Sequence, residues 1–219
     1  MIQRELGADR GVLVVGAVRG SRKDALELSS RLRAHRPLAL GLGISFEELT
    51  GLRDYFVGTD TEPLVPLTGN EVAEMRGLVA FGEVSVPNPA YLAALEFAKE
   101  QSLPVEAVDP TDDHYANLFT SSIGYLELVR RTLRERRLTR RPPAASSADE
   151  YAVNWERESA PGRGSKKFQL ERDAAAVDAA RRLIRVHPRI ALIFDRERFE
   201  RVLTLLEKPA PAARLSSAT

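Results

Sequence analysis

The chain has 219 residues, 43% of them hydrophobic, which is enough for one sizeable domain with a buried core. Its formal net charge of +1 excludes a strongly polycationic nucleic-acid-binding protein on bulk charge alone, and with 0 cysteines it can form neither a disulfide nor a thiolate metal site. The first eleven residues are charged and lack the apolar core of a signal peptide, and no apolar run approaches the ~20 residues of a membrane span. We therefore expect a cytoplasmic protein.

Hydrophobic patterning predicts alternating strands and helices from the first residues onward. Residues 11–18 (GVLVVGAV) are typical of a central strand buried on both faces, and residues 38–44 (LALGLGI) of a second strand. Between them, Ser21 is expected to cap a helix that Pro37 ends, and Ser45 to cap a further helix that runs to residue 56. This order predicts parallel strands joined by a right-handed crossover.

The same alternation continues after a Gly- and Pro-containing loop at 57–69. Two further strands are expected at 104–109 and 189–195, and helices at 70–82, 88–103, 114–138, 168–188 and 196–208. Residues 140–167 are rich in Pro, Ser, Ala and charge, which predicts a long flexible insertion or lid. The tail, residues 208–219, is predicted to be disordered.

The predicted fold class is α/β. A single domain over residues 1–207 should contain a mixed or mainly parallel sheet of at least four strands, flanked by helices and interrupted by the flexible insertion.

The turn after the first predicted strand is the first candidate site. Gly16, Gly20 and Ser21 precede a helix whose free N–H groups could hold an anion, and Arg19 at the tip of the turn could assist. The segment GAVRGS matches neither the phosphate loop of nucleotide hydrolases nor the GxGxxG pattern. Plain turn geometry is the alternative interpretation.

Histidine and arginine patterns point to two other kinds of site. The 3 histidines stand in separate segments without the spacing of metal ligands, so no metal site is expected. The segment RRTLRERRLTRR could face nucleic-acid phosphates or an anionic membrane surface, since four arginines share one side of the expected helix: Arg130, Arg134, Arg137 and Arg141. The alternative is a solvated helix end, and the absence of interleaved aromatic residues argues against single-strand binding.

The order of these segments resembles the TraB family, within the superfamily that includes Tiki-type peptidases, erythromycin esterase-like and ChaN-like proteins. The resemblance covers most of residues 12–206 and rests on the segments VLVVGAVRGS, RPLALGLGIS, AALEFAKE with PVEAVD, and LERDAAAVDAARRLI with RIALIFDRER. It implies an α/β fold in which histidines and a glutamate act as metal ligands or as acid and base.

The departures from this family pattern fall on the residues that the resemblance would make catalytic. Arg19 and Arg198 stand where the family has the histidines of its two GxxH turns, Gly43 where it has the glutamate, and Ala90 near an acidic position. Three residues keep the family's identity: Glu171, Arg172 and Asp173. Since an arginine neither binds a metal nor exchanges its proton at ordinary pH, we expect no catalytic residue, no metal and no cofactor.

These departures predict a non-catalytic, divergent TraB-like protein, a pseudoenzyme that binds an anionic small molecule or a partner protein in a regulatory role. The expected ligand-binding residues are Gly16, Arg19, Gly20, Ser21, Glu171, Arg172 and Arg198. The three arginines among them should converge at the strand ends and need acidic partners, for which the candidates are Asp109, Glu171, Asp195 and Glu197.

A purely structural ion network at the same place is the alternative to a ligand site. Two further functions stay open: a hydrolase of the same superfamily acting through Ser21 or Glu171, and a nucleic-acid-associated protein using the arginine helix. A homo-oligomer is also compatible with the sequence.

Overall fold

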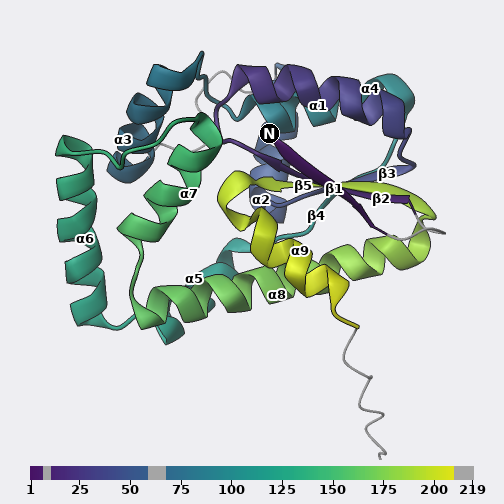
Figure 1. Cartoon of the computed structure of the whole chain (residues 1–219). Coiled ribbons are helices and arrows are strands. Elements are labelled where there is room, and N and C mark those ends of the chain that lie inside the picture. Colours follow the sequence, from purple (N-terminus) through teal and green to yellow (C-terminus); the bar gives the residue numbers. More distant parts are fainter. Residues whose placement is uncertain (7–10, 59–67, 210–219) are drawn as a thin grey trace, which may run out of the picture.

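Five strands form one mixed sheet in the computed structural model, which describes residues 1–6, 11–58 and 68–209 (Figure 1). In spatial order they are β1 (Ile2–Leu6), β2 (Gly11–Ala17), β5 (Arg189–Asp195), β3 (Ala39–Leu42) and β4 (Val105–Ala107). The last four run parallel and β1 runs antiparallel to β2. The predicted single-domain α/β class with a mainly parallel sheet is confirmed.

Strands β2 and β5 form the buried centre of the sheet, as their unbroken apolar sequences predict. Val14 lies opposite Leu192, and every residue of the two strands after the first is buried. Strand β1 was not predicted, because IQREL exposes its three middle residues and carries no clear alternation. Its charged residues suit an edge strand, since they discourage pairing with another chain.

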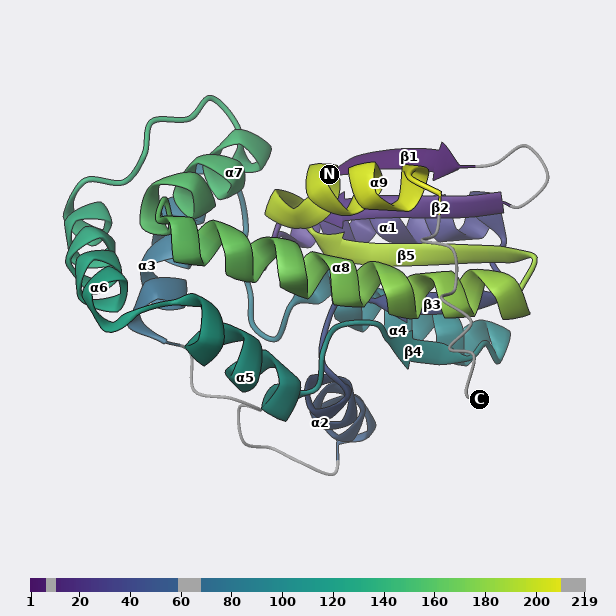
Figure 2. The ribbon, with the colours of Figure 1, turned by 90° about the horizontal axis from the view of Figure 1, so that it is seen from below.

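Helices cover both faces of the sheet (Figures 1 and 2). One face packs against α1 (Arg22–His35), α2 (Phe46–Val57) and α4 (Pro89–Gln101), and the other against α8 (Arg163–Val186) and α9 (Phe199–Glu207). The predicted N-caps Ser21 and Ser45 are confirmed, since each accepts a hydrogen bond from a backbone N–H of the following helix. Asn88 caps α4 in the same way.

A third group of helices lies beyond the carboxyl ends of the parallel strands. It consists of α3 (Gly69–Leu78), α6 (Tyr125–Arg140) and α7 (Ala148–Ser159). A short 3₁₀ turn, η1 (Val79–Phe81), follows α3 directly. Tyr151 and Trp155 of α7, each 2% exposed, pack with Leu138 and with Val18 at the end of β2. This apolar cluster attaches the three helices to the sheet edge.

Helix α7 corrects the expectation of an irregular loop at 140–167. Ser147 caps the helix, and Tyr151, Ala152 and Trp155 form a buried stripe at helical spacing. The Pro- and Ser-rich composition of the flanks concealed this stripe. The predicted single helix at 114–138 is also wrong, because extended backbone at Ile123 separates α5 (Asp112–Ser122) from α6.

The C-terminal segment begins with a short turn, η2 (Arg196–Arg198), before α9. The predicted loop at 57–69 and the predicted disordered tail at 208–219 fall mostly outside the described residues. Within the ranges that the structure describes, no helix is both long and apolar enough to cross a membrane.

Candidate functional site

The candidate site lies where the parallel strands end. Strands β2, β5, β3 and β4 share one carboxyl edge, and the chain leaves them at or just before Arg19, Asp195, Gly43 and Asp109. In α/β sheets ligands bind at this edge. Arg172 and Asp173 of α8 and Arg201 of α9 add their side chains to the same place.

Arg198 is the centre of a buried ion network. Its guanidinium donates to Asp173 at 2.8 Å, to the two carboxylate oxygens of Asp109 at 2.7 and 3.0 Å, and to the carbonyl of Gly43 at 3.1 Å. The residue is 2% exposed. Burial opposes its charge, but Asp109 and Asp173 outweigh that effect and raise the pKa of Arg198 above its ordinary value. Arg198 is therefore a fixed structural cation.

Two more arginines extend this network to the surface. Arg172 donates from Nε to Asp109 at 2.8 Å and lies 5.2 Å from the ring centre of Tyr115. Arg201 donates to Asp173 at 2.6 Å and to both carboxylate oxygens of Glu156, at 2.7 and 3.0 Å. We call the six residues the edge network: Arg172, Asp109, Arg198, Asp173, Arg201 and Glu156. Its three cations and three carboxylates alternate, so it is self-neutral.

The position that the family resemblance gives to a glutamate is filled by other groups. A Cβ on Gly43 would collide with the ring of Phe194, which itself lies 5.4 Å below the Arg198 guanidinium. Gly43 also uses its carbonyl to accept from Arg198. Glycine is therefore required here by close packing, and the space that a carboxylate would need is occupied.

Arg19 forms a second, more open centre. It donates to Asp195 at 2.7 Å and to Glu71 at 2.7 Å, and its side chain is 30% exposed. Asp195 also accepts from the hydroxyl of Tyr91 at 3.2 Å. Burial acts to raise the pKa of Asp195, but Arg19 more than offsets it and lowers that pKa below the ordinary range.

Several further carboxyl groups surround Arg19 and Asp195. Desolvation raises the pKa of the half-buried Glu74 to about 7, against a usual 4.5, although Arg19 opposes the shift. It raises the pKa of Glu48, an exposed residue, in the same direction. Desolvation and then Asp195 raise the pKa of Glu197, whose Oε2 is buried without a hydrogen-bond partner among the described residues. We call the four groups around Arg19 the acidic rim: Glu48, Glu71, Glu74 and Glu197.

The raised pKa values make a testable prediction for stability against pH. Since the folded-state pKa of Glu74 lies near 7 and the unfolded value near 4.5, the folded chain holds more protons between these values. The contribution of Glu74 to the free energy of unfolding should therefore be greatest below pH 4.5 and decline as the pH rises to about 7.

Urea unfolding of wild type and Glu74→Gln across this range measures that contribution as a difference. We expect the wild type to lose stability relative to Glu74→Gln as the pH rises, whereas Glu96→Gln, at an exposed position of α4, should stay parallel to wild type. If the wild type instead gains stability relative to Glu74→Gln toward neutral pH, the attraction of Arg19 outweighs desolvation and lowers the pKa of Glu74.

The glycine turn is built for packing and for internal capping. A Cβ on Gly16 would lie 2.7 Å from Phe199, and Gly20 has a φ of +81°. At the start of α1, the Asp24 carboxylate accepts from the Val18 N–H at 2.8 Å and from the Ser21 hydroxyl at 3.1 Å. Asp24 thus occupies the place where an external anion was expected, so the anion site at this turn stays a prediction that the geometry does not favour.

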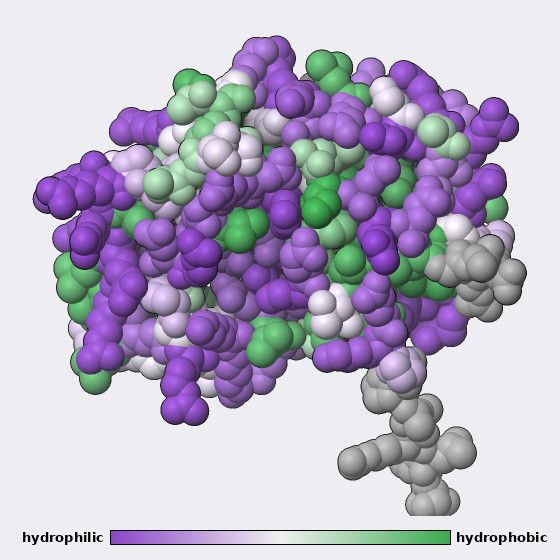
Figure 3. Space-filling view, viewed as in Figure 1, coloured by the Kyte–Doolittle hydropathy of each residue, from purple (hydrophilic) through white to green (hydrophobic). Residues whose placement is uncertain are grey.

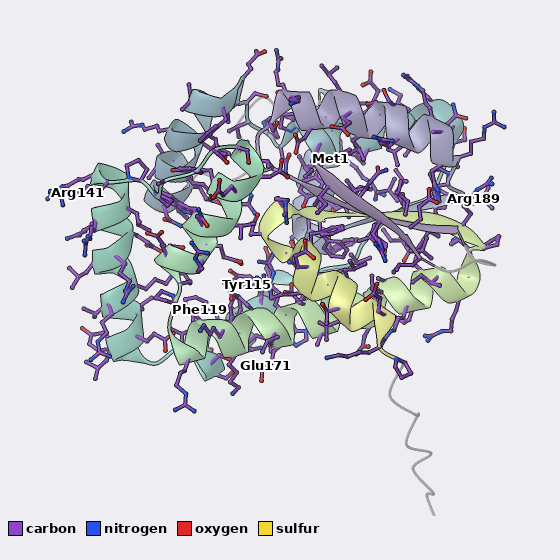
Figure 4. All side chains as sticks on the ribbon, in the orientation of Figure 1. Met1, Tyr115, Phe119, Arg141, Glu171 and Arg189 are labelled. Atoms are coloured by element: carbon purple, nitrogen blue, oxygen red, sulfur yellow. The ribbon has the colours of Figure 1, made fainter. Side chains whose placement is uncertain are left out.

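The other predicted residues divide into two groups. Arg19, Arg172 and Arg198 do lie at one sheet edge, and Asp109 and Asp195 are their partners, as expected. Glu171 does not join them: it accepts from Ser122 and pairs with Lys167, and it lies at the outer side of α8 (Figure 4). Ser21 has Asp24 beside it and no histidine contact, so its hydroxyl serves as a cap.

Three members of the acidic rim were missed in the sequence: Glu48, Glu71 and Glu74. Glu48 follows the end of a predicted strand by a few residues, a position that could have drawn notice. Glu74 lies on α3, and only the packing of α3 against α7 brings it to Arg19. The described residues contain no group of three or more His, Asp or Glu side chains arranged to hold a metal ion.

Comparisons with known proteins add little to this geometry. No protein-family model and no curated protein sequence matches the chain. Among solved structures, the chain is similar to an erythromycin esterase in its open conformation, with 13% sequence identity, a TM-score of 0.36 and 84% of this chain covered. The chain spans only 60% of that esterase chain. A likeness at this level carries no argument about activity, so the TraB resemblance stays a prediction.

Proposed function

We propose that the chain is a non-catalytic, divergent TraB-like protein that binds a small molecule at the carboxyl edge of its sheet and acts in regulation. One observation carries the proposal. Arg198 takes the place that the resemblance gives to a histidine, and it is buried between Asp109 and Asp173. A guanidinium held in this way supplies neither a metal ligand nor a proton-transfer group.

The acidic rim favours a ligand that carries a cationic or N–H donor group. Arg19 pairs directly with Asp195 and Glu71, and Arg172 and Arg198 act on Asp195 from the edge network, where other carboxylates already pair with them. The rim carboxyls and Asp195 outnumber Arg19, so an added anion would meet a surplus of acidic groups. An added cation would favour ionisation of Glu48 and Glu74. This reverses the sign of the ligand expected from the arginines in the sequence.

Ligand-induced thermal shifts test this proposal. A panel of amines, guanidines, carboxylates and phosphates should yield stabilisation by cationic members, of about 5–10 °C at a concentration of 100 Kd. Glu74→Gln should reduce the shift, and the matched variant Glu96→Gln should preserve it. Stabilisation confined to anions and abolished by Arg19→Gln would support the anion pocket instead.

A hydrolase is the second candidate function, because Glu48 and Glu74 have pKa values of about 7, suited to general acid–base catalysis near neutral pH. In such a hydrolase, Glu48 and Glu74 would be the catalytic residues, in place of Ser21 and Glu171. It predicts turnover of simple nitrophenyl esters with a pH dependence centred near 7, and a loss of about 10²–10⁴-fold in Glu74→Gln. No turnover above that of Glu48→Gln/Glu74→Gln would favour the binding protein.

A further inference from the structure

Helix α6 exposes an apolar stripe that nothing in the described part of the chain covers. The helix contacts α3 and α7 through the side that carries the buried Leu138. Turning 100° per residue, it places four apolar residues within one outward stripe on its first turns: Tyr125, Leu126, Val129 and Leu133. Tyr125 is 78% exposed, Leu126 70% and Leu133 59%.

Arginines border and continue this stripe. Six of them are exposed and make no ion pair within the described residues: Arg130, Arg134, Arg136, Arg137, Arg140 and Arg141. Arg131 differs, because it turns inward to pair with Glu135 and lies over Phe119. Figure 3 shows hydrophobic and hydrophilic residues side by side along the border of the molecule where α6 lies, and Figure 4 places Arg141 at its outer end.

We propose that this face, the α6 surface, docks on a membrane surface that contains anionic lipid. A helix with an apolar stripe and a dense set of arginines fits the interface of a bilayer, where the apolar side chains enter the acyl boundary and the guanidiniums meet the headgroup phosphates. The ten residues named above supply both elements on one peripheral helix, which makes its outward side accessible (Figure 2).

Charge and composition separate this partner from the alternatives. A second copy of the α6 surface would place six arginines against six, which is repulsive. Nucleic acid would explain the arginines but would leave Leu126, Val129 and Leu133 without a role, since phosphate contacts need no aliphatic partners. The anionic bilayer uses both sets of side chains.

Vesicle co-sedimentation of the full chain tests the proposal. Phosphatidylcholine vesicles containing about a third phosphatidylserine should bind the wild type, and pure phosphatidylcholine should bind it much less. Arg130→Gln/Arg134→Gln/Arg137→Gln should weaken binding about 100-fold, and Leu126→Ser/Leu133→Ser at least about tenfold.

Matched variants on other helices serve as controls. Arg182→Gln/Arg185→Gln removes exposed arginines near the end of α8, and Leu26→Ser/Val186→Ser removes two exposed apolar side chains from α1 and α8. Both should bind vesicles as wild type does. Failure of wild type to bind anionic vesicles, or binding unaffected by the α6 variants, would overturn the proposal. Binding of short duplex DNA or RNA that depends on the arginines and not on Leu126 and Leu133 would identify a nucleic-acid surface.

Discussion

Replacing Arg198 with methionine should lower the free energy of unfolding by about 3–5 kcal/mol. Among the residues that the structure describes, Arg198 is the only cation that bridges Asp109 and Asp173, whose side chains are 3% and 1% exposed. Arg172 and Arg201 still pair with these aspartates from the surface side, but the inner oxygens lose their donors. The large loss of stability arises because two buried carboxylates are each left with an oxygen that accepts no hydrogen bond.

Chemical denaturation measures this effect, and two variants control it. Arg22→Met breaks the exposed pair with Glu83 and should cost less than about 1 kcal/mol. Combining Arg198→Met with Asp109→Asn and Asp173→Asn should recover part of the lost stability, because no buried carboxylate charge is then left without its cation. A cost for Arg198→Met as small as that of Arg22→Met would mean that the aspartates are solvated and that the edge network is not structural.

Replacing Gly43 with alanine should lower the free energy of unfolding by about 1–3 kcal/mol. The new methyl group would press on the ring of Phe194 and lie 3.2 Å from the Ile193 carbonyl, in a part of the sheet where neither neighbour can retreat into solvent. Gly43→Glu should cost more, since it adds a carboxylate to the same collision. Introducing the glutamate that the TraB resemblance places at this position should therefore impair folding.

The same denaturation experiment separates overpacking from helix or backbone effects. Gly69→Ala adds a methyl group at a position where no atom of the described residues lies within 4 Å, and it should be close to neutral. Gly43→Ala/Phe194→Leu should be more stable than the sum of the two single changes predicts, because the smaller side chain makes room. Additive costs would contradict the packing argument.

The fold was largely predictable because its central strands and first helices follow local rules. A few consecutive residues are enough to recognise the apolar strands β2 and β5. The same holds for the helix caps Ser21, Ser45 and Asn88. Helix α7 was not predicted, because its buried stripe of Tyr151, Ala152 and Trp155 is short and the composition around it favoured a loop. Strand β1 escaped because its pairing with β2, rather than its sequence, defines it.

The candidate site was predictable only in part. The convergence of Arg19 and Arg198 followed from the order of the strands, since parallel strands end at one edge. Arg172 lies on α8, and only the family resemblance suggested that it joins them. How each arginine is partnered did not follow, because the pairs join residues far apart in the chain, such as Arg198 with Asp109. The acidic rim depends on α3, whose place over the sheet edge is set by tertiary packing.

The charge of the ligand that the acidic rim prefers distinguishes a cation site from an anion site. We would titrate the protein calorimetrically at pH 7 with benzylamine and with benzoate, a cation and an anion of similar size, in two buffers of different protonation enthalpy. We expect benzylamine to bind with net release of protons as Glu48 and Glu74 ionise, and Glu74→Gln to reduce both the affinity and the proton release. Benzoate binding that Arg19→Gln abolishes would contradict this expectation.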